Sequence, residues 1–141
     1  MVGLLADRSL YRYTGGETPP TVAELRERYA RQIAGPRPPS ADRWLNWIVR
    51  SDGVALGYVQ ATVMARTAEI AWVIGTAHQG QGYATEAAGA MAEALAETGT
   101  DTLQAHIHPR NRPSQIVAER LGLRKLPVHA FDGEDLWQRT L

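Results

Sequence analysis

The 141-residue sequence contains no cysteine, which excludes a disulfide scaffold, a thiolate metal site and a cysteine nucleophile. It also has no net charge, because Lys+Arg and Asp+Glu both number 15. Bulk charge therefore indicates neither nucleic acid nor an acidic membrane as a partner. No apolar run approaches the roughly 18 residues of a membrane span, and no signal-like segment opens the chain. We expect a cytoplasmic protein with one domain, residues 1–141.

The most informative stretch runs from Ala68 to Thr98. Its first part, AEIAWVIG, is a short apolar run that predicts a largely buried strand over 68–75. Its last part, AAGAMAEALAET, is rich in helix formers and stops at Gly99. The strand and the helix are joined by a turn that contains the sequence QGQGYA.

The two glycines of this turn, Gly80 and Gly82, allow a sharp backbone bend and leave no Cβ in the way of a ligand. The helix that follows directs unpaired N–H groups and the positive end of its dipole into the turn. This combination predicts a pocket for a phosphate-bearing ligand. Two alternatives remain open: a tight connection with no ligand, and a dinucleotide site. The dinucleotide fingerprint, however, needs a third glycine where Thr85 stands.

The rest of the chain predicts further helices and strands. A capping box at Thr21 and Glu24 predicts a helix over 21–34, and Ser51-Asp52-Gly53 predicts the turn of a hairpin over 44–63. Beyond Gly99 the patterns predict a strand at 102–108, a helix at 113–121 and a final strand at 134–141. The strands at 68–75 and 102–108 should be parallel, because a helix joins them.

Two motifs in this order resemble those of the GNAT superfamily of N-acetyltransferases. The first is Gln79-x-x-Gly82-x-Ala84, between a strand and a helix, and the second is Asn111-x-x-Ser114, which is followed by AERLGL. The surrounding AWVIGTAHQGQGYATEA is similar to the branch of the ribosomal-protein N-terminal acetyltransferases. The resemblance covers roughly residues 44–141.

The resemblance implies an α/β fold with a mixed, mostly antiparallel sheet, in which one parallel strand pair is joined by a crossover helix and helices flank the sheet. Relatives usually open with an additional strand. Residues 1–20 show no convincing strand, so the first strand of this sheet could be missing.

The resemblance also implies acetyl-CoA as cosubstrate, with no metal. The residues it places at the coenzyme are Trp72, Val73, Ile74, Gln79, Gly80, Gln81, Gly82, Tyr83, Ala84, Thr85, Asn111 and Ser114. Family members often carry Arg or Lys in the turn, whereas this chain has Gln79 and Gln81. Arg110 and Arg112 could help at the adenosine end, or could be solvated loop residues.

Acetyl transfer to an amine requires a polarised carbonyl, a base for the amine and an acid for the leaving thiolate. By resemblance, Glu69 is the candidate base, acting through a water. The alternative is an ion pair between Glu69 and an arginine of a neighbouring strand. The helix after Ser114 has no tyrosine, so Ser114 or water is the candidate acid. Without cysteine, direct attack of the amine in a ternary complex is the expected mechanism.

Other residue patterns leave further alternatives open. His106 and His108 share a strand face, but without a nearby carboxylate they make a poor metal site. His108 could instead touch substrate. Trp44 and Trp47 could stack on a substrate, or could pack on a sheet face.

The sequence thus predicts an acetyl-CoA-dependent N-acetyltransferase whose acceptor is a primary amine, either a protein N-terminus or a small molecule. A non-catalytic acetyl-CoA-binding or degenerate member is the main alternative, and a nucleotide-binding regulatory module is a second. We expect no nucleic-acid or membrane partner, and a homodimer stays open.

Overall fold

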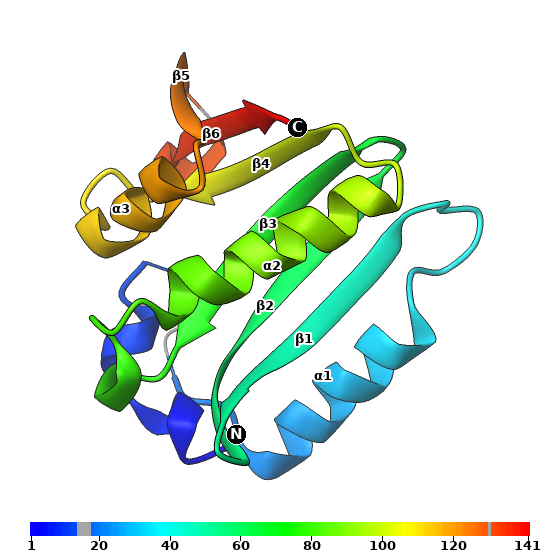
Figure 1. The fold of residues 1–141 in the computed structure, drawn as a ribbon. Coiled ribbons are helices and arrows are strands. Elements are labelled where there is room, and N and C mark those ends of the chain that lie inside the picture. The colour runs from blue at the N-terminus through cyan, green and yellow to red at the C-terminus, as the bar shows by residue number, and fades with distance from the viewer. Residues whose placement is uncertain (14–17, 130) are drawn as a thin grey trace.

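The computed structural model describes residues 1–13, 18–129 and 131–141, and it is built around a mixed sheet of six strands (Figure 1). The strands are β1 (Arg43–Ser51), β2 (Val54–Met64), β3 (Thr67–Ile74), β4 (Thr102–Ile107), β5 (Arg124–His129) and β6 (Asp135–Thr140). The helices are α1 (Val22–Ala34), α2 (Tyr83–Glu97) and α3 (Arg112–Arg120). Short 3₁₀ turns are η1 (Leu4–Ala6), η2 (Arg8–Tyr11), η3 (Thr76–His78) and η4 (Phe131–Gly133). No helix in these residues is long and apolar enough to cross a membrane.

The predicted helix near the N-terminus forms because both halves of its capping box are made. Glu24 N–H donates to Thr21 Oγ1 at 3.2 Å, and Thr21 N–H donates to the Glu24 carboxylate at 2.7 Å. The helix ends at Gly35, where φ is +75°. The prediction of a helix over 21–34 is confirmed.

The predicted hairpin is also confirmed. Strands β1 and β2 are antiparallel, with Trp44 opposite Thr62 and Ile48 opposite Tyr58. Asp52 and Gly53 both have positive φ values at the turn, which matches the right-handed twist of the strands.

The hydrophobic core lies between the sheet and helices α2 and α3. Alternate residues of each strand face it, so the buried side chains of β2, β3 and β4 meet those of the two helices. The largest fully buried side chains are Leu95, Leu103 and Val63. Helix α1 packs against the opposite face of the sheet, over β1 and β2.

The strand order is β1-β2-β3-β4-β6-β5, and β3 and β4 form the parallel pair that was predicted. Helix α2 makes the crossover between them (Figure 1). The last predicted strand is β6, and within the described residues no strand precedes Arg43.

One strand, β5, was not predicted. It contains Pro127, which cannot donate to a ladder, and its pairing with β6 is irregular between Lys125 and His129. The N-terminal turns η1 and η2 were not predicted either.

Candidate functional site

The sheet opens between its two parallel strands. Strands β3 and β4 pair only over three positions, from Thr67↔Thr102 to Glu69↔Gln104. Beyond these positions no described strand pairs with the β4-facing edge of residues 70–74. The strands therefore diverge and leave a gap.

The backbone of β3 directs polar groups into this gap. Gly75 N–H donates to the Leu56 carbonyl of β2 at 2.8 Å. Because hydrogen-bond direction alternates along an antiparallel strand, the N–H groups of Trp72 and Ile74 point away from β2, toward the gap. The Ile74 carbonyl points the same way and accepts a hydrogen bond from Gln79 Nε2 at 2.8 Å. Within the described residues, the Trp72 amide has no strand partner on this side.

The N-terminus of α2 faces the same space. Gly80 and Gly82 have φ values of +74° and +87°, which L side chains rarely adopt, and Gly82 is the N-cap residue of α2. No side chain caps this end of the helix. The N–H groups of its first turn, on Tyr83, Ala84 and Thr85, are therefore available to an anion.

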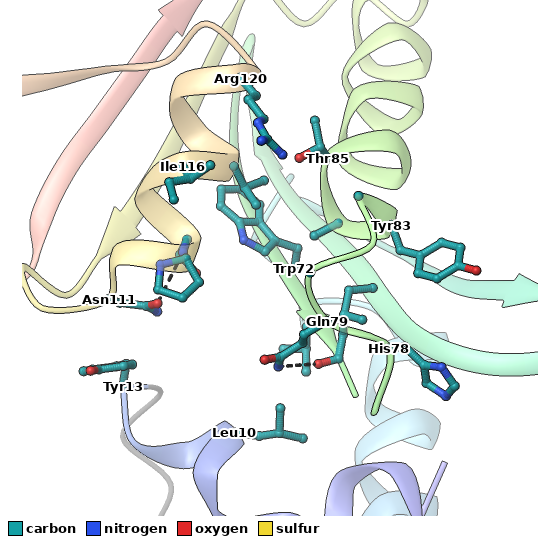
Figure 2. Close-up of a pocket in the computed structure, with 18 of the residues that line it drawn as sticks. Leu10, Tyr13, Trp72, His78, Gln79, Tyr83, Thr85, Asn111, Ile116 and Arg120 are labelled. Carbon is teal, nitrogen blue, oxygen red and sulfur yellow. Dashed lines mark hydrogen bonds between the residues drawn. The ribbon is translucent and has the colours of Figure 1, made fainter. Parts of the chain in front are cut away.

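A cavity of about 570 Å³ joins the gap to the N-termini of α2 and α3 (Figure 2). It is lined by Ser9, Leu10, Arg12, Tyr13, Trp72, Val73, Ile74, His78, Gln79, Gly80, Gly82, Tyr83, Ala84, Thr85, Asn111, Pro113, Ser114, Ile116, Val117 and Arg120. Trp72 and Val73 are consecutive strand residues whose side chains point to opposite faces of the sheet. Both residues line the cavity, which therefore lies along β3 beside the gap.

The structure brings nearly all the residues expected at the coenzyme to this cavity. Gln81 is the exception among them, since it is exposed and does not line the cavity. Gln79 lines the cavity, but its side-chain amide is also used to tie the turn to the end of β3.

Asn111 and Ser114 have a local structural role that the sequence analysis did not assign. The Asn111 side chain is the N-cap of α3 and accepts a hydrogen bond from Ser114 N–H at 3.3 Å. Pro113 lies in the first turn. The spacing of an Asn cap before Pro is a capping signal in the sequence, so the motif can be explained by helix formation as well as by ligand binding.

The N-terminal segment supplies one wall of the cavity. Leu10 and Tyr13 lie across from Trp72 and Asn111 (Figure 2). The Tyr13 ring lies 5.1 Å from the ring of His108 at the end of β4, with an interplanar angle of 34°. Thr76 Oγ1 donates a hydrogen bond to the Asp7 carboxylate, which lowers the Asp7 pKa and fixes the segment beside β3.

Two arginines also line the cavity, in place of the basic residues that the turn lacks. Arg12 comes from the N-terminal segment and Arg120 from the last turn of α3. The Arg120 side chain extends toward Thr85 in the first turn of α2 (Figure 2). Neither guanidinium forms an ion pair with a described residue. By contrast, Arg112 pairs with Glu119 at 2.9 Å, and Arg110 is exposed outside the cavity.

Glu69 lies outside the cavity. It is exposed on the sheet face opposite α2, across from Thr62 of β2 and Gln104 of β4. Its carboxylate makes no ion pair with any described residue, so the alternative of a partner arginine is wrong for this part of the chain. Trp72 is three residues further along the strand, about 10 Å away at the rise of a β-strand.

Other candidates are placed elsewhere. Trp44 and Trp47 lie on the edge strand β1, are 40% and 36% exposed, and line neither this cavity nor another described one. His106 is exposed on β4, and no cluster of His, Asp or Glu in the described residues could hold a metal ion.

Known proteins match this chain in sequence pattern and in fold. The sequence pattern of the "Acetyltransferase (GNAT) domain" family, Acetyltransf_3, matches residues 1–124. No curated protein sequence gives a significant match.

Three solved structures illustrate the likeness in fold. A domain from Methanocaldococcus jannaschii is 18% identical, with 99% of this chain and 89% of that chain covered and a TM-score of 0.79. An aminoglycoside acetyltransferase in complex with coenzyme A is 19% identical, with 99% and 86% covered and a TM-score of 0.78. Spermidine N-acetyltransferase from Vibrio cholerae, with CoA and spermine, is 19% identical, with 99% and 85% covered and a TM-score of 0.74.

Proposed function

This chain belongs to the GNAT acetyltransferase family, and we propose that it moves an acetyl group from acetyl-CoA to a primary amine by direct attack in a ternary complex. Acetyl-CoA is the cosubstrate. The observation that carries the proposal is the cavity that joins an uncapped helix N-terminus to an unpaired strand edge. These two features suit the two ends of the coenzyme, its pyrophosphate and its thioester.

In this proposal the pyrophosphate lies at the first turn of α2. The free N–H groups of Tyr83, Ala84 and Thr85 and the positive end of the helix dipole attract an anion there. Arg120, which extends toward Thr85, supplies the positive charge that Gln79 and Gln81 do not. A charge-assisted hydrogen bond of this kind is about twice as strong as a neutral one.

The thioester end of the coenzyme would enter the gap between β3 and β4. The Trp72 N–H, which points into the gap, would donate to the thioester carbonyl oxygen and stabilise the charge that develops there. The amine attacks the carbonyl carbon, the C–S bond breaks, and the acetyl group remains on the amine. Absence of cysteine is consistent with this single transfer, because the usual acyl-cysteine intermediate cannot form.

Two protons must move in this reaction. Glu69 would accept one from the acceptor ammonium through a chain of water, which leaves the neutral amine to attack, since Glu69 is exposed on the face where β3 and β4 begin to diverge. Ser114 lies at the N-terminus of α3 and lines the cavity, so its hydroxyl is placed to protonate the leaving thiolate, directly or with water.

The acceptor is a primary amine, either a protein N-terminus or a small molecule. The solved relatives include enzymes for an aminoglycoside and for spermidine. The narrower likeness to the ribosomal-protein branch stays a prediction from the sequence.

Calorimetric titration tests the coenzyme site. We expect acetyl-CoA and CoA to bind and NAD not to bind, and tight binding of NAD alone would overturn the proposal in favour of a dinucleotide module. A panel of amines, followed by release of free CoA thiol, then separates an enzyme from a non-catalytic member of the family. Binding of acetyl-CoA without acetylation of any amine in the panel would favour the non-catalytic alternative.

A further inference from the structure

A second cavity, of about 250 Å³, lies on the face of the sheet opposite α2. We shall refer to it as the α1 cavity, because helix α1 covers it. It is lined by Leu5, Arg28, Tyr29, Gln32, Asn46, Ile48, Tyr58 and Gln60. The four strand residues share one sheet face, since Asn46 is opposite Gln60 and Ile48 is opposite Tyr58.

The polar side chains of the α1 cavity are not paired with one another. Within the described residues, no side-chain hydrogen bond or ion pair is formed by Arg28, Tyr29, Gln32, Asn46, Tyr58 or Gln60. The Tyr29 hydroxyl is buried with no hydrogen-bond partner among the described residues. Asn46 is exposed, and the other five side chains are half-buried. Polar groups withdrawn from water are normally hydrogen-bonded, so a concentration of unpaired ones indicates a place for a polar ligand.

The charge of the lining favours an anion. Among the described residues, Arg28 is its one ionised group and no carboxylate lines the cavity. Two acids of the helix flank Arg28. Glu24 is used in the capping box, where Thr21 N–H donates to it at 2.7 Å, and its pKa is lowered mainly by the Thr21 hydrogen bonds and also by the Arg28 charge. Glu27 lies 3.9 Å from Arg31. The Arg28 charge also acts on Tyr58, whose pKa is raised by burial against the lowering effect of that guanidinium. An unpaired guanidinium between hydroxyl and amide groups suits a carboxylate.

The α1 cavity is next to the proposed reaction centre. Tyr58 of its lining is directly opposite Val73, and Gln60 is directly opposite Ala71. Val73 also lines the cavity of the proposed coenzyme site. Neighbouring strands are about 4.8 Å apart, so a group over β1 and β2 lies roughly 7–10 Å from the gap.

We propose that the α1 cavity binds the carboxylate of the acceptor, so that the substrate is an amino acid whose amine and carboxylate are separated by a chain of several carbons. This inference rests on the proposed acetyl transfer. The polycationic acceptors named for the solved relatives would put positive charge against Arg28, which is unfavourable.

Matched ligands and matched variants test this inference. The ligands are ω-amino acids of about six to about eight carbons, which span the separation of roughly 7–10 Å, and their neutral carboxamides. Binding is measured by calorimetry on protein saturated with CoA, and acetylation is measured separately by thiol release. The variants are Arg28→Gln and, as a control, Arg26→Gln, which removes an arginine of α1 that does not line the cavity.

We expect the carboxylates to bind about tenfold more tightly than their carboxamides, because a charge-assisted contact to Arg28 is lost in the amide. The preference should disappear in Arg28→Gln and persist in Arg26→Gln, with acetyl-CoA affinity unchanged in both. Equal binding of acid and amide in the natural protein would overturn the inference, and so would an unchanged preference in Arg28→Gln.

The acetylation measurement distinguishes the two proposals. If no amine in a broad panel is acetylated, the proposed enzymatic function fails, whatever the binding ratio. If other amines are acetylated while the carboxylate ligands bind through Arg28 and only inhibit, the function stands and the identification of the acceptor is contradicted.

Discussion

Gly82 combines two requirements at one residue, a backbone conformation and an open approach to a helix end. Its φ of +87° favours glycine, and a Cβ added there would meet no atom within 4 Å. In the free protein, backbone conformation rather than crowding therefore limits which residue can stand at position 82. Both requirements are visible in the sequence, because glycine before a helix-forming segment is a local signal. The capping role of Asn111 is also a local signal in the sequence, because Asn shortly before Pro is typical of the start of a helix.

Substitution of Gly82 tests whether an anion binds at this helix end. Gly82→Asp places a carboxylate beside the pyrophosphate, and we expect acetyl-CoA binding to weaken by about 2 kcal/mol or more, roughly 30-fold. Gly82→Asn is the matched control, since it has the same shape and tolerance for positive φ without the charge. Calorimetry of the two folded variants makes the comparison, and equal affinities would contradict the proposal.

Arg120 gives a second, independent test of the coenzyme site. Arg120→Gln removes the unpaired guanidinium that extends toward Thr85, so we expect acetyl-CoA affinity to fall about tenfold. The loss should be smaller at high salt, because the contact is electrostatic. Arg110→Gln, an exposed arginine outside the cavity, should leave affinity unchanged at every salt concentration.

Removing the charge of Glu69 tests whether this residue is the base. Glu69→Gln preserves shape, and if Glu69 is the base we expect kcat/KM at pH 7 to fall by about 10² to 10⁴. Part of the loss should return as the pH rises, because alkyl amines titrate near pH 10 and more free amine appears. The melting temperature should be unchanged, since Glu69 has no ion-pair partner among the described residues. A variant with full activity would remove Glu69 from the mechanism.

At the scale of elements, contacts between two loops stabilise the closed end of the gap, where β3 and β4 still pair. One loop joins β2 to β3, and the other joins α2 to β4. Arg66 Nε donates to the Asp101 carboxylate at 2.6 Å, and Asp101 N–H donates to the Arg66 carbonyl at 2.9 Å. These contacts join the start of β3 to the start of β4, where the two strands still pair. They fix the point from which the strands diverge.

The contact between Arg66 and Asp101 predicts that the stability of the protein depends on pH. The hydrogen bond from Arg66 lowers the Asp101 pKa below 3.8, so its stabilising effect is present at neutral pH and is lost as pH falls through the folded pKa. Asp101→Asn should therefore melt at a lower temperature than the natural protein at pH 7, and the difference should shrink below about pH 4. Melting curves across this range make the test. Asp42→Asn is the control, because it removes a carboxylate that has no ion-pair partner among the described residues. If the melting-temperature difference between Asp101→Asn and the natural protein stayed constant across this pH range, the assignment would be contradicted.

Elements with local signals could be predicted from the sequence, and elements that depend on distant partners could not. Helix α1 has its capping box within four residues, and the hairpin has its turn at Asp52 and Gly53. Strand β5 has a weak pattern interrupted by Pro127, and it forms because β6 offers an edge. The wall at Leu10 and Tyr13 depends on the contact of Asp7 with Thr76, 69 residues away, which no local pattern reveals.

At the scale of the whole molecule, the sheet acts as a frame that brings distant segments to one cavity. The N-terminal turns, the end of β3 and the starts of α2 and α3 all line it. In the proposed reaction, coenzyme and acceptor are bound together beside the gap, and the acetyl group moves without a covalent enzyme intermediate.

Two-substrate kinetics test this account most directly. Initial rates of CoA thiol release would be measured against acetyl-CoA at several fixed concentrations of an accepted amine. The account predicts double-reciprocal lines that intersect, because both substrates must be bound before the acetyl group moves. Parallel lines, together with an acetylated protein trapped without the amine, would contradict it and would show that a residue of the chain carries the acetyl group.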